Sequence, residues 1–312
     1  MGPRRRNRRQ PIEDEHRVDA SESRSGRRRR PNVAPIWFVG PATVLFLVFI
    51  GWPLVASLAQ SFQVRLGGEM VWAGLHNYGR LAADPLVATS LANALLLLIL
   101  QVPLMIGLAL VLAVALNQTW LHLRSQFRIV YFLPAVTTLV AYSIVFRVLL
   151  RTDSGIVNQL LGAAGITPID WLEDPFWARI ALIASITWRW TGYNVVILLA
   201  GLQAIPREIF ETAAIDGAGQ RVMFRSITVP LLRPVILFCL VTSTIGTLQL
   251  FDENYILTRG GPANATLTPV LYLYKTAFQG LDFAYASAIA WLLVVVIGVL
   301  ALLQFRVLGR ET

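Results

Sequence analysis

Residues 91–116 read LANALLLLILQVPLMIGLALVLAVAL, inside a longer uncharged run from Pro85 to Leu123. A helix rises 1.5 Å per residue, so about 20 mostly apolar residues cross the roughly 30 Å hydrocarbon layer of a membrane. A helix can do so because its backbone hydrogen bonds close within the segment. This stretch therefore predicts a membrane-spanning helix.

The rest of the chain has the same character. Of its 312 residues, 55% are hydrophobic and 14% are charged, which lies far outside the usual composition of soluble domains. Arg189 interrupts one of the remaining apolar segments. Five further spans are expected at about 35–60, 127–150, 176–203, 233–256 and 283–305. The sequence thus predicts an all-α integral membrane protein with six transmembrane helices.

Several enzyme classes are excluded by the residues that the chain lacks. Its one lysine, Lys275, follows no glycine-rich stretch, so a phosphate-binding loop that ends in Gly-Lys-Ser/Thr is absent. The single Cys239 cannot form an intramolecular disulfide, and three scattered histidines have no zinc-ligand spacing. No Gly-x-Ser-x-Gly occurs. We expect no enzymatic activity, no metal and no cofactor on this chain.

The positive charge is concentrated at the amino terminus. Residues 1–30 hold eleven arginines and five acidic residues, a net charge of +6 out of +9 for the whole chain. With both termini in the cytoplasm, the inner segments carry 19 basic residues and the outer segments seven, as the positive-inside rule requires. We expect residues 1–31 to be a disordered, lipid-facing arm and residues 32–312 the transmembrane domain. Nucleic-acid binding is the alternative for the arm, but no folded module accompanies it.

One cytoplasmic connection does not have the composition of a loop. Residues 205–230 read IPREIFETAAIDGAGQRVMFRSITVP. Pro206 suits a first helical position, and Gly217 suits a tight stop. A second helix is expected at about 218–227, ended by Pro230 and Pro234. The pattern predicts a helix–turn–helix on the membrane surface; an ordinary amphipathic loop packed on its own helices is the alternative.

The same segment resembles a family motif. The string from Glu211 to Gly217, followed at the right spacing by Ile227 and Pro230, is similar to the E-A-A-x-x-x-G-x9-I-x-L-P motif of binding-protein-dependent ABC importer permeases. Two positions depart from it, Thr212 and Val229. The resemblance implies the MetI-like permease fold of type I importers, with a coupling helix at about 205–230. It implies ATPase coupling through Glu211, Ala213, Asp216, Gly217, Ile227 and Pro230.

A second stretch narrows the resemblance, which covers about residues 85–305. Residues 250–266, LFDENYILTRGGPANAT, are similar to a segment typical of carbohydrate permeases of the maltose-transporter type. In length and basic arm the chain is similar to a trehalose-importer permease of actinobacteria. The expected substrate is therefore a sugar such as the disaccharide trehalose.

The resemblance also implies partners. They are a second permease subunit, two ATPase subunits that bind ATP and Mg, an extracytoplasmic sugar-binding lipoprotein, and the lipid of a bacterial plasma membrane. A secondary transporter and an ABC permease for a non-sugar solute, such as phosphate or a peptide, remain alternatives. The first would need its own ion site and an inverted repeat, of which the sequence shows no sign.

Polar residues inside the predicted spans form a second candidate site. A charge such as Arg189 is costly within a bilayer, so it is expected to face the bundle interior or a wet cavity. Aromatic faces and hydrogen-bonding groups together suit a sugar. The candidate translocation path comprises Trp188, Arg189, Trp190, Tyr193, Asn194, Gln249, Asp252, Glu253 and Asn254.

The alternative for these residues is structural. Arg189 would then pair with Asp252 or Glu253, or hold the second permease. Asn93 and Gln101 are expected to make hydrogen bonds between helices.

Overall fold

The computed structural model describes residues 34–118 and 124–309, so the predicted arm at residues 1–31 lies outside the described residues. The chain divides after Trp52 into two units. The first unit contains helix α1 (Ala34–Phe46) and the π-helical turn η1 (Leu47–Gly51). Its apolar side chains are exposed, as in a helix that faces lipid; Phe38, for example, is 86% exposed.

The second unit begins with a helix and a β-hairpin. Helix α2 (Trp52–Ser61) leads into strands β1 (Gln63–Leu66) and β2 (Glu69–Trp72), which pair antiparallel with Val64 opposite Val71. Gly67 and Gly68 make the turn with positive φ angles of 60° and 94°. The all-α prediction was wrong here, although a Gly-Gly turn between apolar residues is itself a hairpin signal.

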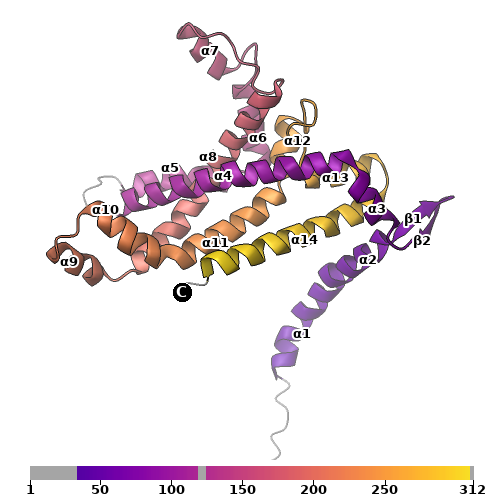
Figure 1. Cartoon of the computed structure of the whole chain (residues 1–312), viewed down its shortest axis with the longest axis horizontal. Helices are drawn as coiled ribbons and strands as arrows, with labels where there is room; N and C mark the ends of the chain where they lie inside the picture. The colour runs from indigo at the N-terminus through magenta and orange to yellow at the C-terminus, as the bar shows by residue number, and fades with distance from the viewer. Residues whose placement is uncertain (1–33, 119–123, 310–312) are drawn as a thin grey trace, which may run out of the picture. The chain divides into compact units, whose positions relative to one another are not determined.

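Three long helices form the core of this unit (Figure 1). Helix α4 (Pro85–Asn117) packs against α8 (Pro175–Ala204) and α11 (Val229–Leu248), and α14 (Phe283–Leu308) packs on α11. The residues shared among the first three are small or aliphatic, which lets the helices interlock closely. They include Val102, Met105, Ala109, Ala113, Val195, Leu198, Leu202, Leu232 and Cys239.

Within the described residues, four helical stretches are long and apolar enough to cross a membrane: Trp37–Ser61, Pro85–Asn117, Gln220–Leu257 and Phe283–Leu308. A bent pair, Ile129–Val136 with Leu139–Leu149, would make five. The expected count of six is therefore not confirmed. Helix α8 has 30 residues, enough length to span. Its polar middle around Arg189 lowers its hydropathy, and it is not in this set.

The predicted span at 127–150 is broken. Helices α5 (Arg124–Val136) and α6 (Leu139–Leu149) meet at an angle of 104°. Helix α5 packs on α8, and α6 leads to the short helix α7 (Ile156–Ala163). The sequence of residues 154–165 predicts a short surface helix with a cap at Ser154, because apolar residues recur on one side and glycines follow. The helix is confirmed as α7, but its N-cap is Gly155.

The second helix of the coupling segment was predicted to end at Pro230 and Pro234, and this was wrong. Helix α10 (Gln220–Met223) continues through the π-helical turn η2 (Phe224–Thr228) into α11. Pro230 lies in the first turn of α11, where a missing N–H costs little, and a π turn accommodates an irregular bonding pattern. Five short elements complete the unit: α3 (His76–Ala83), α9 (Arg207–Ile215), α12 (Asp252–Leu257), α13 (Pro269–Tyr274) and η3 (Lys275–Gln279).

Candidate functional site

The predicted coupling segment begins with helix α9, whose carboxyl end is capped, followed by a turn. Helix α9 ends in a Schellman motif: Ala218 N donates to Ala213 O at 2.9 Å, and Gly217 N donates to Ala214 O at 3.1 Å. Gly217 occupies the left-handed position with φ of 79°. The helix–turn–helix expected from the sequence is therefore present as far as the turn, and its second helix runs on into α11.

The outer face of α9 is open to solvent. Glu211, Asp216 and Gly217 are exposed, and Ala213 is half-buried. Ile215, a large apolar side chain, is 87% exposed. The outer face of α9 therefore carries both charged and apolar side chains that the rest of the described chain leaves uncovered.

The other two motif residues lie on the return helix. Ile227 is half-buried in η2, and Pro230 is exposed at the start of α11. The motif thus spans α9 and the base of a long continuous helix, because α10, η2 and α11 form one helical stretch from Gln220 to Leu248.

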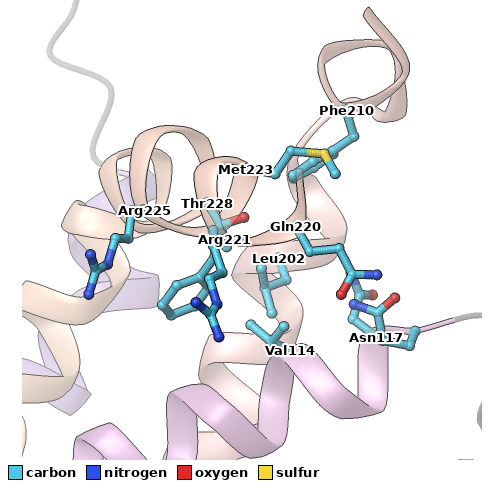
Figure 2. Close-up of a pocket in the computed structure, with 11 residues that line it drawn as sticks. Val114, Asn117, Leu202, Phe210, Gln220, Arg221, Met223, Arg225 and Thr228 are labelled. Atoms are coloured by element: carbon cyan, nitrogen blue, oxygen red, sulfur yellow. The ribbon is translucent and has the colours of Figure 1, made fainter. Parts of the chain in front are cut away.

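A hollow of about 730 Å³ lies behind the coupling segment, between α10 and η2 and the ends of α4 and α8. Figure 2 shows Val114 and Leu202 on one side, Phe210 and Met223 on another, and Arg221 and Arg225 extending from the same helical stretch. The remaining lining residues are Asn117, Gln118, Gln220, Phe224 and Thr228.

A smaller cavity of about 210 Å³ lies among α4, α8 and α11. It brings Tyr193, Asn194 and Trp190 of the predicted path together with Gln101. Asn194 is 2% exposed, and its Oδ1 has no hydrogen-bond partner among the described residues. The hydroxyl groups of Thr242, Ser243 and Thr247 also line this cavity and were not foreseen from the sequence. The run of polar residues 242–244, Thr-Ser-Thr, within an apolar helix was the available signal.

Arg189 is buried, as expected, but its partners differ from the acidic residues expected. Its Nη1 donates to the carbonyl oxygens of Thr137 at 2.5 Å and Pro134 at 3.2 Å, and its guanidinium lies 4.8 Å from the Tyr142 ring centroid. Among the described residues it forms no ion pair with Asp252 or Glu253. The guanidinium therefore occupies the carboxyl-terminal end of α5, where the broken helix leaves carbonyl groups unbonded.

Trp188 lies in an aromatic cluster beside that break. Its ring centroid is 5.4 Å from Phe146 and 6.4 Å from Tyr142, and the side chain is 49% exposed. Neither Trp188 nor Arg189 lines the 210 Å³ cavity. Of the predicted path residues on α8, Trp190, Tyr193 and Asn194 therefore line the cavity. Trp188 and Arg189 lie instead beside the break between α5 and α6.

The four predicted path residues that follow α11 lie in two different environments, buried and exposed. Glu253 is buried and accepts a hydrogen bond from Tyr142 Oη at 2.5 Å, which joins α12 to α6. Asn254 is fully buried and donates to Thr266 O at 2.6 Å. Gln249 is exposed and Asp252 half-buried. Glu253 and Asn254 therefore hold the local structure together, and the other two face outward or partly so.

Two hydrogen-bond expectations can be checked directly. Gln101 Oε1 accepts from Thr247 Oγ1 at 3.2 Å, which confirms a bond between helices α4 and α11. Asn93 instead donates to the carbonyl oxygens of Asn264 and Leu267, at 2.8 Å and 3.0 Å, so it binds a loop and not a helix.

A polar cluster at the start of α4 was not foreseen. Asp84 accepts hydrogen bonds from Tyr272 Oη at 2.6 Å and Tyr285 Oη at 2.7 Å. Arg80 lies 3.7 Å over the Tyr285 ring and pairs with Asp282 at 2.6 Å. Burial acts to raise the pKa of Asp84, but the two tyrosine hydrogen bonds and two backbone amides outweigh it and lower that pKa. Burial and the Asp84 hydrogen bond raise the pKa of Tyr272 to about 12.

Comparison with known proteins agrees with this architecture. The model of the family described as binding-protein-dependent transport system inner membrane component matches residues 32–311. The lactose transport system permease protein of Rhizobium radiobacter is 46% identical over 291 residues, which cover 92% of this chain and 97% of that protein. The arabinooligosaccharides transport system permease protein of Bacillus subtilis (strain 168) is 33% identical over 299 residues, covering 94% and 95%.

A solved structure shares the fold. It is a bacterial ABC transporter involved in the import of the acidic polysaccharide alginate, and one of its chains matches with a TM-score of 0.80. The match covers 90% of this chain and 98% of that chain, at 23% sequence identity. Together with the family match over residues 32–311, this means that the chain belongs to the family of inner membrane components of binding-protein-dependent transport systems.

Proposed function

We propose that this chain is the permease subunit of an ATP-driven sugar importer and that helix α9 couples it to a separate ATPase. The observation that carries the proposal is the exposed helix α9, whose carboxyl end is capped by a Schellman motif and whose exposed face holds Glu211 and Ile215. This helix lies in the segment that contains the family's coupling motif. ATP and Mg bind the partner ATPase in this proposal, and this chain holds no cofactor and catalyses no reaction.

The proposed substrate class is a disaccharide or short oligosaccharide. Two relatives of at least 33% identity are named for the transport of lactose and of arabino-oligosaccharides. Neither supports trehalose in particular, so the proposal stops at the class of sugar. The protein itself would supply half of the translocation pore, and a second permease subunit the other half.

The proposed partners follow the same logic. A sugar-binding protein would dock on the extracytoplasmic side, with both termini of this chain in the cytoplasm. A related solved structure is described as an alginate ABC transporter in complex with a periplasmic protein bound to an alginate pentasaccharide. Two ATPase subunits would bind the coupling segments of the two permeases.

The mechanical part of the proposal rests on helix continuity. A displacement of α9 would pass through the turn at residues 216–219 to the base of α11, because α10, η2 and α11 form one helical stretch from Gln220 to Leu248. It also reaches α8 through the short link at Ile205 and Pro206. Because α8 and α11 line the 210 Å³ cavity, movement at the coupling segment would reshape the cavity wall.

The candidate path for the sugar is that cavity, and not the whole set of residues expected from the sequence. Trp190 and Tyr193 offer aromatic faces, while Gln101, Asn194 and Thr247 offer hydrogen-bonding groups. At 210 Å³ the cavity is smaller than most small-molecule sites, which agrees with a half-site completed by a second subunit.

Reconstitution separates this proposal from a self-contained transporter. The chain is co-expressed with a second permease, an ATPase and a binding protein from the same organism, purified and placed in liposomes. We expect an ATPase subunit to co-purify in a fixed ratio and sugar uptake to require ATP and the binding protein. Sugar uptake by this chain alone, driven by an ion gradient, would rule the proposal out.

A further inference from the structure

The hollow behind the coupling segment has a composition that the coupling role does not explain. Its lining combines apolar side chains, such as Val114, Leu202 and Met223, with polar ones that include two arginines, Arg221 and Arg225. No carboxylate belongs to the lining within the described residues. A volume of about 730 Å³ lies within the range of small-molecule sites.

The two arginines are exposed and have no counter-charge among the described residues. They are four residues apart, so they extend from neighbouring positions on one helical stretch (Figure 2). In residues 34–118 and 124–309, neither has an ion-pair or hydrogen-bond partner. Two guanidinium groups on one side of a hollow without a lining carboxylate favour an anion there. Guanidinium groups bind phosphate oxygens in pairs of parallel hydrogen bonds.

The position of the hollow suggests where the anion comes from. Helix α4 has 33 residues and is therefore about 50 Å long, whereas the hydrocarbon layer measures about 30 Å. We expect its last turn, with Val114 and Asn117, at the headgroup layer of the membrane, because the predicted span of residues 91–116 ends there. A site at this depth that combines apolar side chains with two cations matches a phospholipid, whose phosphate is joined to acyl chains.

We propose that the hollow binds the phosphate of an anionic phospholipid from the cytoplasmic leaflet and that the bound lipid supports coupling. The lipid lies between α10 and η2 and the ends of α4 and α8, so it fills the space into which the coupling segment would otherwise collapse. The inference rests on the proposed function for its cytoplasmic orientation. It differs from the coupling role, because α9 offers its other face to the ATPase.

The test uses the purified importer complex in nanodiscs of phosphatidylcholine alone or mixed with phosphatidylglycerol. The variant is R221Q/R225Q, and the matched control is R207Q, which removes an exposed arginine of the same segment that does not line the hollow. Retained lipid is counted by native mass spectrometry after delipidation. Substrate-stimulated ATPase activity is measured across phosphatidylglycerol contents.

We expect the wild type and R207Q to retain phosphatidylglycerol and R221Q/R225Q to lose it. The variant should also need at least about threefold more phosphatidylglycerol for half-maximal stimulation, because each basic residue near the surface adds to lipid binding. Equal lipid retention in the variant would overturn the proposal. Equal loss in R207Q would do the same, because it would mean that any arginine of the segment serves.

Two further outcomes also contradict the lipid site. If R221Q/R225Q loses the ATPase subunit during purification, the arginines bind the protein partner, and the proposed function stands without the lipid. If millimolar inorganic phosphate stimulates the wild type in pure phosphatidylcholine, the site takes a free anion. Failure of the wild-type complex to contain any ATPase would instead refute the proposed function, while lipid retention by the chain is still measured separately.

Discussion

Arg189 is the residue whose role the structure changes most. A charge in a predicted span suggested either a sugar contact or an ion pair. The structure instead shows hydrogen bonds from its guanidinium to carbonyl oxygens of Pro134 and Thr137, at the break between α5 and α6. Such a partner could not be predicted, because every residue has a backbone carbonyl group and only the fold determines which of them lack a hydrogen bond.

Replacing Arg189 should therefore loosen the break. We expect Arg189→Gln to destabilise the protein by about 2 kcal/mol, since hydrogen bonds to charged groups contribute about 1.5–3 kcal/mol. Arg189→Lys should restore little, because a single ammonium cannot reproduce the planar fork. Thermal unfolding of the purified protein in detergent measures both. Full rescue by lysine would mean that only the charge matters.

Gly217 is a residue for which sequence and structure agree. Its φ of 79° is unfavourable for residues with a side chain, yet an added Cβ would meet no atom within 4 Å. We expect Gly217→Ala to cost about 1 kcal/mol through backbone strain alone. Gly217→Asn should cost less, because asparagine tolerates this conformation. Equal stability of the two variants, measured by thermal unfolding, would exclude strain as the cause.

Asp84 gives a prediction about pH. Its pKa is lowered in the folded protein, so its contribution to stability is complete above the unfolded value of about 3.9 and is lost as the pH falls through the folded pKa. We expect Asp84→Asn to lower the unfolding temperature by the same amount at pH 5 and pH 7. Below about pH 4 the difference should shrink. A difference that grows toward acid pH would contradict this sign.

At the scale of elements, the crossing of α5 over α8 depends on one glycine. A Cβ built on Gly192 would lie 1.8 Å from Tyr131 O, a backbone atom that cannot swing away. We expect Gly192→Ala to force the helices apart and to cost about 3 kcal/mol, near the upper end for overpacking. The matched control is Gly246→Ala in α11, where an added Cβ meets nothing.

These two variants differ only in what surrounds the new methyl group. Gly246→Ala should leave stability unchanged or raise it slightly, because alanine favours a helix more than glycine does. Thermal unfolding of both variants, together with protein yield in membranes, measures the difference. Similar stability of the two variants would show that the close approach of Tyr131 O does not govern the cost at Gly192.

The long elements were predictable, and their interruptions were not. Apolar runs predicted α4 and α14 well, because burial in lipid depends on composition alone. The break near Thr137 and the uninterrupted passage through Pro230 depend on tertiary partners and on a π turn. The hairpin was not predicted, because the predicted elements rested on long apolar runs and the strands are only four residues each. Gly67 and Gly68 were nevertheless a turn signal.

At the scale of the whole molecule, the coupling segment was predicted and the cavity was not. The motif residues are contiguous in sequence, so their grouping around the turn at Gly217 could be read directly. The cavity joins Gln101 of α4, Asn194 of α8 and Thr247 of α11, and no spacing rule connects three separate helices. The comparison with relatives then supports the family, whereas the sugar depends on proteins outside this chain.

The central claim is that α9 transmits the work of a partner ATPase. Glu211→Lys reverses the charge on the exposed face of α9, and Glu69→Lys makes the same change on the β-hairpin as a matched control. The most direct measurement is substrate-stimulated ATPase activity of the purified complex, with subunit composition checked in parallel. We expect Glu211→Lys to lower the stimulated activity by about tenfold, equivalent to about 1.4 kcal/mol of lost coupling, and Glu69→Lys to leave it unchanged. Unchanged stimulation in an intact Glu211→Lys complex would contradict the account.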